Sequence, residues 1–196
     1  RLMREGVSVD DLGELDLGSV EDAASCMQET PAGLPAACAT PRVTTSSAIR
    51  ALTVEELPLA ARYGADFYVE ARLPGRFDPD LFIALWTTLL NNGSGVILGV
   101  WAGDEFAGAL AAMVAPDIYD GRLIAMEFFW YTRPEYRRGV RPVRLIQAYE
   151  AWAIGKGVRL TDVRMAAIEG VNDEQIGRLY RALGYRPLER QWGREA

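Results

Sequence analysis

The sequence predicts an α/β domain, in which a mixed sheet carries helices on both faces. Three observations indicate this class. From residue 47 onward, apolar segments of strand length alternate with amphipathic segments of helical length. Two of the strands flank a Gly103-Asp104-Glu105 turn, which is typical of a hairpin. A later apolar strand runs through a glycine-containing turn into a helix that opens at Pro142.

The first half of the domain is expected to hold one short strand and two helices. Residues 48–52 form the strand. Thr53 and Glu56 have the spacing of a capping box, so a helix is predicted over 53–71, with Pro58 either kinking or restarting it. A loop follows, and then an amphipathic helix over 80–92 that ends at Gly93.

The second half supplies the rest of the sheet. Its strands, in chain order, are expected at 95–102, 105–115, 122–132, 160–168 and 185–192. Helices are predicted from Pro142 to about 155 and over 173–183, the second ending at Gly184. The strand at 122–132 is apolar nearly throughout, which favours a central place in the sheet.

Residues 1–46 form an acidic N-terminal arm. They hold three arginines against eight acidic residues, which is −5 of the chain's net charge of −6. Ser19 and Asp22 indicate a short helix, and the Pro/Ala/Thr/Ser-rich residues 29–46 indicate a linker. Such a segment buries too little apolar surface to fold alone. We expect it to contact another subunit of a larger assembly, with packing on its own domain as the alternative.

Composition excludes several kinds of chemistry. The chain has no histidine, so Ser-His-Asp and Cys-His mechanisms and His-ligated metals are ruled out. Cys26 and Cys38 are too few for a zinc site, so no metal is expected, and a reduced cytoplasmic protein fits best. The longest apolar run, 106–115, is too short to span a membrane. The acidic balance argues against nucleic-acid binding. No secretory signal opens the chain, which begins at Arg1, so its true start is left open.

The turn after residue 132 is the strongest functional signal. Gly139 allows close approach of a ligand or a positive φ, and Arg137, Arg138 and Arg141 surround it. Free amides at a helix start attract anions, and arginines add charge-assisted bonds. The segment therefore favours phosphate binding, although an ordinary strand–helix connection with solvated arginines explains the same residues.

Two motifs in the right order resemble the GCN5-related N-acetyltransferase (GNAT) family. The first comprises Pro134-Glu135-Tyr136-Arg137, Gly139, Trp152-Ala153 and Lys156-Gly157, and the second comprises Asn172, Leu179-Tyr180 and Leu183-Gly184-Tyr185. The resemblance covers residues 47–192. It implies a mostly antiparallel central sheet within a domain at 47–196, and an enzyme that transfers acetyl from acetyl-CoA to a small-molecule or protein amine.

The resemblance also implies which residues hold the cofactor. These are Tyr131, Thr132, Arg137, Arg138, Gly139, Val140, Arg141, Val143 and Asn172. One departure matters: the family turn reads Arg/Gln-x-x-Gly-x-Gly/Ala, whereas this chain has Tyr136 first and Arg141 last. Pro142 also removes one main-chain N–H group from the start of the helix. Arg141 either blocks the phosphate or replaces a lost amide bond with its guanidinium.

Two residues are candidates for catalysis. Glu127 is a carboxylate inside an apolar strand, where burial raises its pKa and suits it to act as a base. Two alternatives to a catalytic role are that Glu127 faces an open end of the sheet or that it pairs with an arginine. Tyr180 matches the family's tyrosine that protonates the leaving thiolate, and packing in the core is its alternative role. Asn172 either contacts the cofactor or caps the helix that follows.

The acceptor site is expected near the loop between the first two helices. Asp78 and Asp80 there would attract a cationic amine, although Asp78 also fits a helix N-cap. Most of the aromatic run 128–131 is expected in the core, with one or two rings lining the acceptor groove.

Two other function classes stay open. The segment 125–152 resembles diverged GNAT members of bacteriophages and prophages. A non-catalytic module, located in a virion and anchored by residues 1–46, is the main alternative to an enzyme. A CoA binder without transfer is the third.

Overall fold

The computed structural model describes residues 48–167 and 173–188. The chain divides into two compact units, one up to Ala166 and one from Ala167, and each is described by itself. The predictions for the arm at 1–46 and for Asn172 lie outside the described residues.

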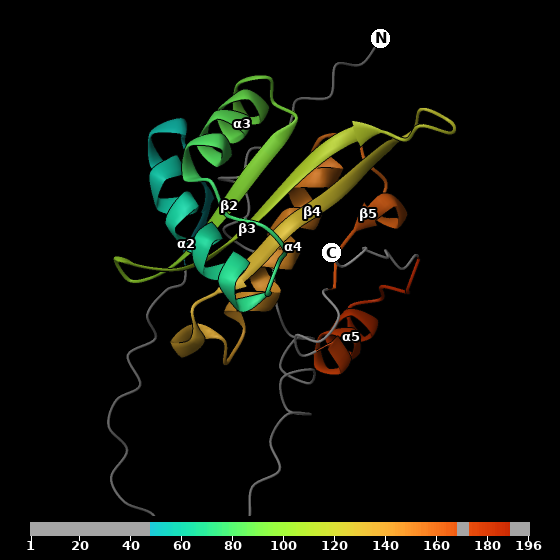
Figure 1. Ribbon diagram of the computed structural model, residues 1–196. Coiled ribbons are helices and arrows are strands. Elements are labelled where there is room, and N and C mark those ends of the chain that lie inside the picture. Colours follow the sequence, from blue (N-terminus) through green and yellow to red (C-terminus); the bar gives the residue numbers. More distant parts are fainter. Residues whose placement is uncertain (1–47, 168–172, 189–196) are drawn as a thin grey trace, which may run out of the picture. The chain divides into compact units, whose positions relative to one another are not determined.

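The first unit is a five-stranded sheet with the order β1-β2-β3-β4-β5 (Figure 1). Neighbouring strands are antiparallel except for the parallel pair β4–β5. The strands are β1 (Ile49–Ala51), β2 (Gly95–Ala102), β3 (Glu105–Pro116), β4 (Leu123–Thr132) and β5 (Val163–Arg164). The helices are α2 (Leu57–Glu70), α3 (Pro79–Asn91) and α4 (Arg141–Gly155), with short 3-10 turns η2 (Val54–Glu56), η3 (Pro134–Tyr136) and η4 (Leu160–Asp162). The predicted mixed, mostly antiparallel sheet is confirmed.

The sheet separates two cores because its apolar side chains alternate between its faces. Against α2 and α3 lies an aromatic-rich cluster that includes Tyr63, Trp86, Phe106, Phe129 and Tyr131. Helix α4 packs on β1, β2 and β3 and buries Leu145, Ile146, Tyr149 and Ala153. Helices therefore cover both faces, as the sequence predicts.

The start of α2 agrees with the capping residues. The Thr53 N–H donates to the Glu56 carboxylate (3.0 Å), so the expected capping contact is made. The chain first forms η2 and then restarts as α2 with Pro58 in its first turn, where the missing N–H costs no helical bond.

Two predicted strands are wrong over the described residues. Instead of a strand over 160–168, only Val163 and Arg164 pair with β4, because residues 160–162 form a 3-10 turn. Residues 185–188 form no strand. The Leu183 and Tyr185 N–H groups fold back onto the Tyr180 carbonyl instead, and Pro187 has no N–H to offer a ladder.

The second unit contains α5 (Asp173–Ala182), which Gly184 ends with a φ of +87°, as its sequence predicts.

In the part of the chain that the structure describes, no helix combines the length and apolarity needed to cross a membrane.

Candidate active site

A β-bulge in β4 decides which way its carboxylate points. Ala111 pairs with Phe129 whereas Ala112 pairs with Glu127, so Phe128 is an extra residue in the ladder. Phe128 meets the Trp86 ring edge-on (6.1 Å between ring centroids), which puts it on the same face as Phe129. Directly paired residues point to the same side of a sheet. Glu127 therefore shares the face of Ala112, toward α4.

The alternation expected for residues 128–131 is overridden by this bulge. Phe129 and Tyr131 are core residues of the α2/α3 face, whereas Phe128 is 52% exposed. Phe128 is thus the most exposed aromatic side chain of this run.

Strand β4 has an open edge beyond the bulge. Its parallel pairing with β5 consists of Ala125–Val163 and Met126–Arg164, and within the described residues no strand continues it beside 127–132. Main-chain N–H and C=O groups along such an edge are available to an extended ligand that carries amides.

Glu127 lies where β4 and β5 separate. Its Oε2 accepts a hydrogen bond from the Ala166 N–H (3.0 Å). Burial raises the pKa of Glu127 to about 7, and the Ala166 bond opposes part of that rise. The Tyr149 side chain on α4 is close enough for Glu127 to contribute to raising the pKa of the phenol, which burial raises most. No arginine of the described residues pairs with Glu127, so the pairing alternative is not realised.

The turn between β4 and α4 presents unpaired donors. Gly139 has a φ of +91°, and a Cβ built on it would meet nothing within 4 Å, so open space lies in front of it. Helix α4 begins at Arg141, and its N-cap Val140 provides no side-chain acceptor. Among the described residues no main-chain acceptor is found for the N–H groups of 138–141 and 143.

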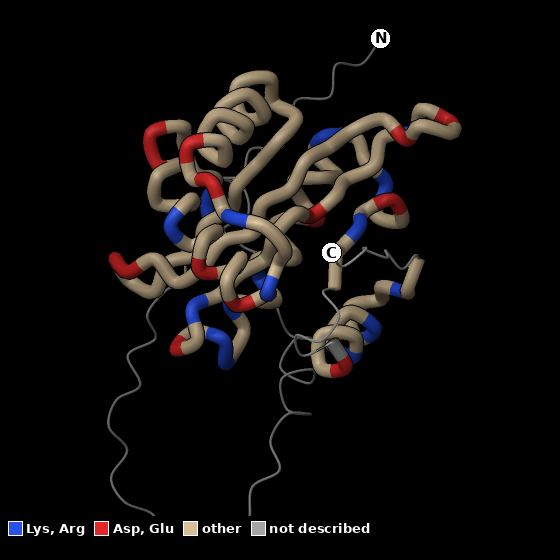
Figure 2. The backbone as a smooth tube through the Cα atoms, in the orientation of Figure 1, with Lys and Arg blue, Asp and Glu red and all other residues tan. Residues whose placement is uncertain are grey.

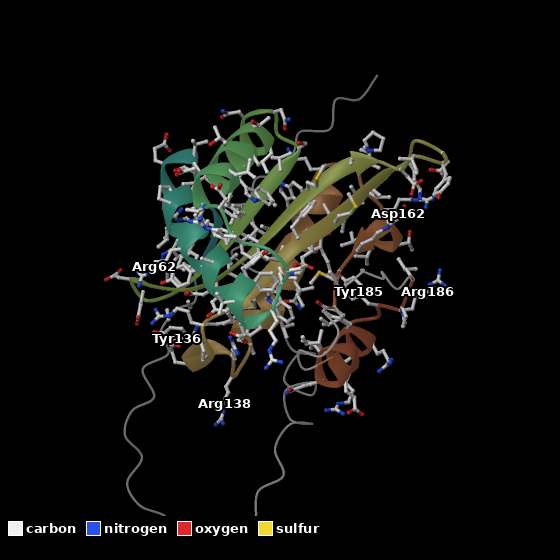
Figure 3. The ribbon with its side chains drawn as sticks, viewed as in Figure 1. Arg62, Tyr136, Arg138, Asp162, Tyr185 and Arg186 are labelled. Atoms are coloured by element: carbon white, nitrogen blue, oxygen red, sulfur yellow. The ribbon has the colours of Figure 1, made fainter. Side chains whose placement is uncertain are left out.

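The arginines of this turn differ in availability. Figure 2 shows basic residues gathered along it. Arg137 is already engaged: it donates to the Glu70 carboxylate on α2 (2.5 Å) and to the Thr132 carbonyl (2.8 Å). Arg138 is exposed, without a partner among the described residues, and projects away from the ribbon in Figure 3. Arg141 lies over the Tyr136 ring (5.6 Å).

Three buried polar atoms near the turn lack a hydrogen-bond partner among the described residues. They are the Thr132 Oγ1 at the end of β4 and the Nε atoms of Arg141 and Arg144 in the first turn of α4. Unpaired buried donors are uncommon in folded proteins and fit a site that awaits an anionic group. The donor set at the turn therefore fits the phosphates of CoA, despite the missing N–H of Pro142.

A cavity on the α2 side of the sheet is a feature that no sequence motif indicated. It has a volume of about 420 Å³ and is lined by Arg62, Tyr63, Asp66, Glu105, Tyr131, Arg133 and Pro134. Within it the Arg133 guanidinium donates to Glu105 (2.7 Å), and the Tyr136 hydroxyl donates to the same carboxylate (2.5 Å). Tyr131 contributes its ring to this side, away from α4. Because these residues come from α2, β3, β4 and the connection that follows β4, only the folded chain brings them together.

Asp78 is a helix cap. Its side chain accepts from the N–H groups of Asp80 and Leu81 (3.0 Å each), so of its two predicted roles the N-cap is the one observed. Asp80 lies in the first turn of α3, where a carboxylate favours the helix dipole.

Tyr180 belongs to the second unit. The centroid of its ring lies 5.8 Å from that of Tyr185, so a tyrosine in α5 pairs with one just after the helix. The roles of Tyr180 and Asn172 at a shared site with Glu127 stay predictions.

The comparisons with known proteins agree with this architecture. No family model and no curated protein matches the chain. Among solved structures, an aminoglycoside acetyltransferase from an uncultured soil metagenomic sample has a TM-score of 0.62 and 18% identity, covering 79% of this chain and 98% of its own. A GCN5-related N-acetyltransferase from Ralstonia eutropha JMP134 has a TM-score of 0.59 and 21% identity, covering 76% and 99%.

A predicted acetyltransferase with acetyl-CoA from Clostridium acetobutylicum has a TM-score of 0.63 and 12% identity, covering 76% and 96%. At identities this low the likeness concerns the fold. The chain has the fold of the GCN5-related N-acetyltransferases.

Proposed function

We propose that this protein is an acyltransferase that moves an acetyl group from acetyl-CoA to an amine. The observation that carries the proposal is the placement of Glu127, a carboxylate with a raised pKa, on a strand whose open edge leads into an anion-attracting turn. Acetyl transfer needs this combination of a base beside the reacting centre and a donor-rich phosphate site.

The turn is proposed to hold the phosphates of the cofactor. The free N–H groups around Gly139 supply neutral donors, and Arg138 and Arg141 supply charge. Thr132 and Tyr131 end β4 beside them, and Val143 offers the next free amide. Acetyl-CoA supplies the activated thioester, and its amide-bearing arm suits the open edge of β4.

Glu127 is proposed to take the proton that the acceptor loses. The amine nitrogen attacks the thioester carbonyl, the carbon–sulfur bond breaks, and the ammonium proton passes to the Glu127 carboxylate directly or through water. Tyr180 is proposed to give its hydroxyl proton to the departing thiolate, which balances the charge. A small cationic amine, as in the aminoglycoside acetyltransferases of the same fold, is the first acceptor class to screen.

Calorimetric titration with acetyl-CoA tests the proposal. We expect heat of binding in the wild type and weaker binding in Gly139→Val, since a β-branched residue is disfavoured at a φ of +91°. Asp104→Asn, at the β2–β3 turn, is the matched control and should bind as the wild type does. With an acceptor found, Glu127→Gln and Tyr180→Phe should each lower turnover by about 10²–10⁴.

A non-catalytic module of the same fold is the second candidate, including the phage virion component. Two features favour it, because both reduce the donors available to a phosphate. Pro142 has no N–H, and Arg137 already forms an ion pair with Glu70. If millimolar acetyl-CoA produces neither heat nor a shift in melting temperature, the enzyme proposal fails and this candidate takes its place.

A further inference from the structure

Strand β5 is too short for its ladder to hold it. It has two residues, Val163 and Arg164, each paired once with β4. Yet the position of β5 matters, because Ala166, two residues further on, donates its N–H to Glu127. Other contacts must therefore anchor this segment.

The first anchor lies at the start of β5. Asp162 is buried, and its carboxylate accepts from the Nε of Arg122 (3.1 Å) and from the Nε of Arg159 (2.7 Å). Arg122 belongs to the β3–β4 connection, so this contact joins β5 to the hairpin 40 residues earlier in the chain. Figure 3 shows Asp162 beside that end of the hairpin.

The second anchor acts through Arg164 itself. Its guanidinium donates to Asp117 (3.1 Å), a carboxylate that is 6% exposed at the end of β3. Asp117 also accepts from the Tyr119 N–H (2.9 Å), and its own N–H donates to the Arg122 carbonyl (2.7 Å). Asp117 is thus fixed by the hairpin and in turn fixes the Arg164 side chain.

The third anchor comes from the opposite side. The Tyr149 hydroxyl on α4, fully buried, donates to the Arg164 carbonyl (3.0 Å). Asp117 holds the side chain of Arg164 and Tyr149 holds its main chain. Two residues later the chain reaches Ala166, with little freedom to move away from β4.

We propose that Asp117 and Tyr149 are positioning residues that hold β5 so that the Ala166 N–H stays on the Glu127 carboxylate. The anchoring stands on the contacts alone, whereas its effect on catalysis rests on the proposed function. Around Glu127, α4 contributes the Tyr149 phenol, the segment after β5 the Ala166 amide, and β3 the apolar Ala112. The amide is therefore the group whose loss would raise the pKa of Glu127.

The test compares three variants of the full chain. Asp117→Asn removes the charge that holds Arg164 and that also contacts Arg122 (3.4 Å), Tyr149→Phe removes only the hydroxyl bond, and Asp104→Asn is the control. Asp104 is exposed in the β2–β3 turn, at the other end of β3 from Asp117. The readouts are hydrogen exchange of the Ala166 amide and NMR titration of the Glu127 carboxyl.

In Asp117→Asn and Tyr149→Phe we expect Ala166 to exchange about tenfold faster relative to the Leu110 amide in β3, a reference for global opening. The Glu127 carboxyl should titrate at higher pH, while Asp104→Asn leaves both readouts unchanged. Equal acceleration of Ala166 and Leu110 would show a merely structural role and overturn the proposal. So would unchanged readouts in both variants, whether or not acetyl-CoA binds.

Discussion

At the scale of the residue, Glu127 is a carboxyl group whose surroundings disfavour its charged form. Its carboxylate has one hydrogen-bond donor, the Ala166 amide, and no arginine counter-charge among the described residues. Burial therefore dominates and raises its pKa to about 7. A carboxyl group that titrates near neutrality changes both the stability and the proposed activity of the protein over the physiological pH range.

The effect on stability has a definite sign. The folded state keeps the Glu127 proton up to about pH 7, whereas the unfolded chain loses it near its ordinary value of 4.5. The folded state thus binds more protons in this window, so the free energy of unfolding falls as pH rises through it. We expect Glu127→Gln to remove this fall, which is at most about 3 kcal/mol. Melting temperatures at pH 5 and pH 8 measure it. Identical pH dependence in both proteins would contradict the buried carboxyl.

At the scale of the element, an ion pair joins β1 to the helical layer. Arg50 on β1 donates to both carboxylate oxygens of Glu56 (2.7 and 2.6 Å). The Glu56 carboxylate also accepts a hydrogen bond from the Thr53 N–H. These bonds lower the pKa of Glu56 to about 2, with the Arg50 hydrogen bond as the largest cause. Because β1 has only three residues, this bidentate contact adds to its short ladder with β2.

Glu56→Gln should destabilise the protein at neutral pH. The folded-state pKa of Glu56 is depressed, so its contribution is present above about pH 4.5 and is lost as pH falls toward 2. Arg50 is half exposed, so solvent screening limits the loss to about 1 kcal/mol at pH 7. Denaturant titrations at pH 7 and pH 3 check this, with Asp104→Asn as the control. A gap between variant and wild type that does not shrink at pH 3 would show that the charge plays no part.

Much of the fold was predictable at this scale, and the predictions failed where contacts form between residues that are far apart in the sequence. The capping pair Thr53–Glu56, the turn at Gly103 and the glycine stops act through neighbouring residues, so the sequence reveals them. The strand β5 is short because a 3-10 turn takes up residues 160–162, and the partner of Asp162, Arg122, lies 40 residues earlier in the chain, so the two meet only after folding. Likewise Glu127 could be picked out as a carboxylate in an apolar strand, whereas its donor Ala166 and its neighbour Tyr149 could not.

At the scale of the whole molecule, the described residues that build the hydrophobic clusters on the two faces run from Leu52 onward. The cluster against α2 and α3 runs from Leu52 to Tyr131. The face toward α4 is completed by residues of that helix up to Ala153. The elements that position Glu127 and the turn therefore come from the domain predicted at 47–196.

We expect a chain that starts at Ser47 to fold and to bind acetyl-CoA as the full chain does. Its melting temperature should lie within a few degrees of the full-length value, since a change of 1 kcal/mol corresponds to about 2–8 °C for domains of this size range. Scanning calorimetry and the acetyl-CoA titration measure both properties. A large drop in melting temperature would show that residues 1–46 stabilise the domain, contrary to their predicted role as an arm for another subunit.

The extra residue in β4, Phe128, interrupts the alternation of neighbouring side chains between the two sides of the sheet. Substitutions between Glu127 and Tyr131 change the chemistry of a side chain but leave the direction in which each one points. Deleting Phe128 would leave Glu127 opposite Ala112 and Phe129 opposite Ala111, so the carboxylate would keep its side of the sheet while the bulge and its exposed aromatic ring would be lost.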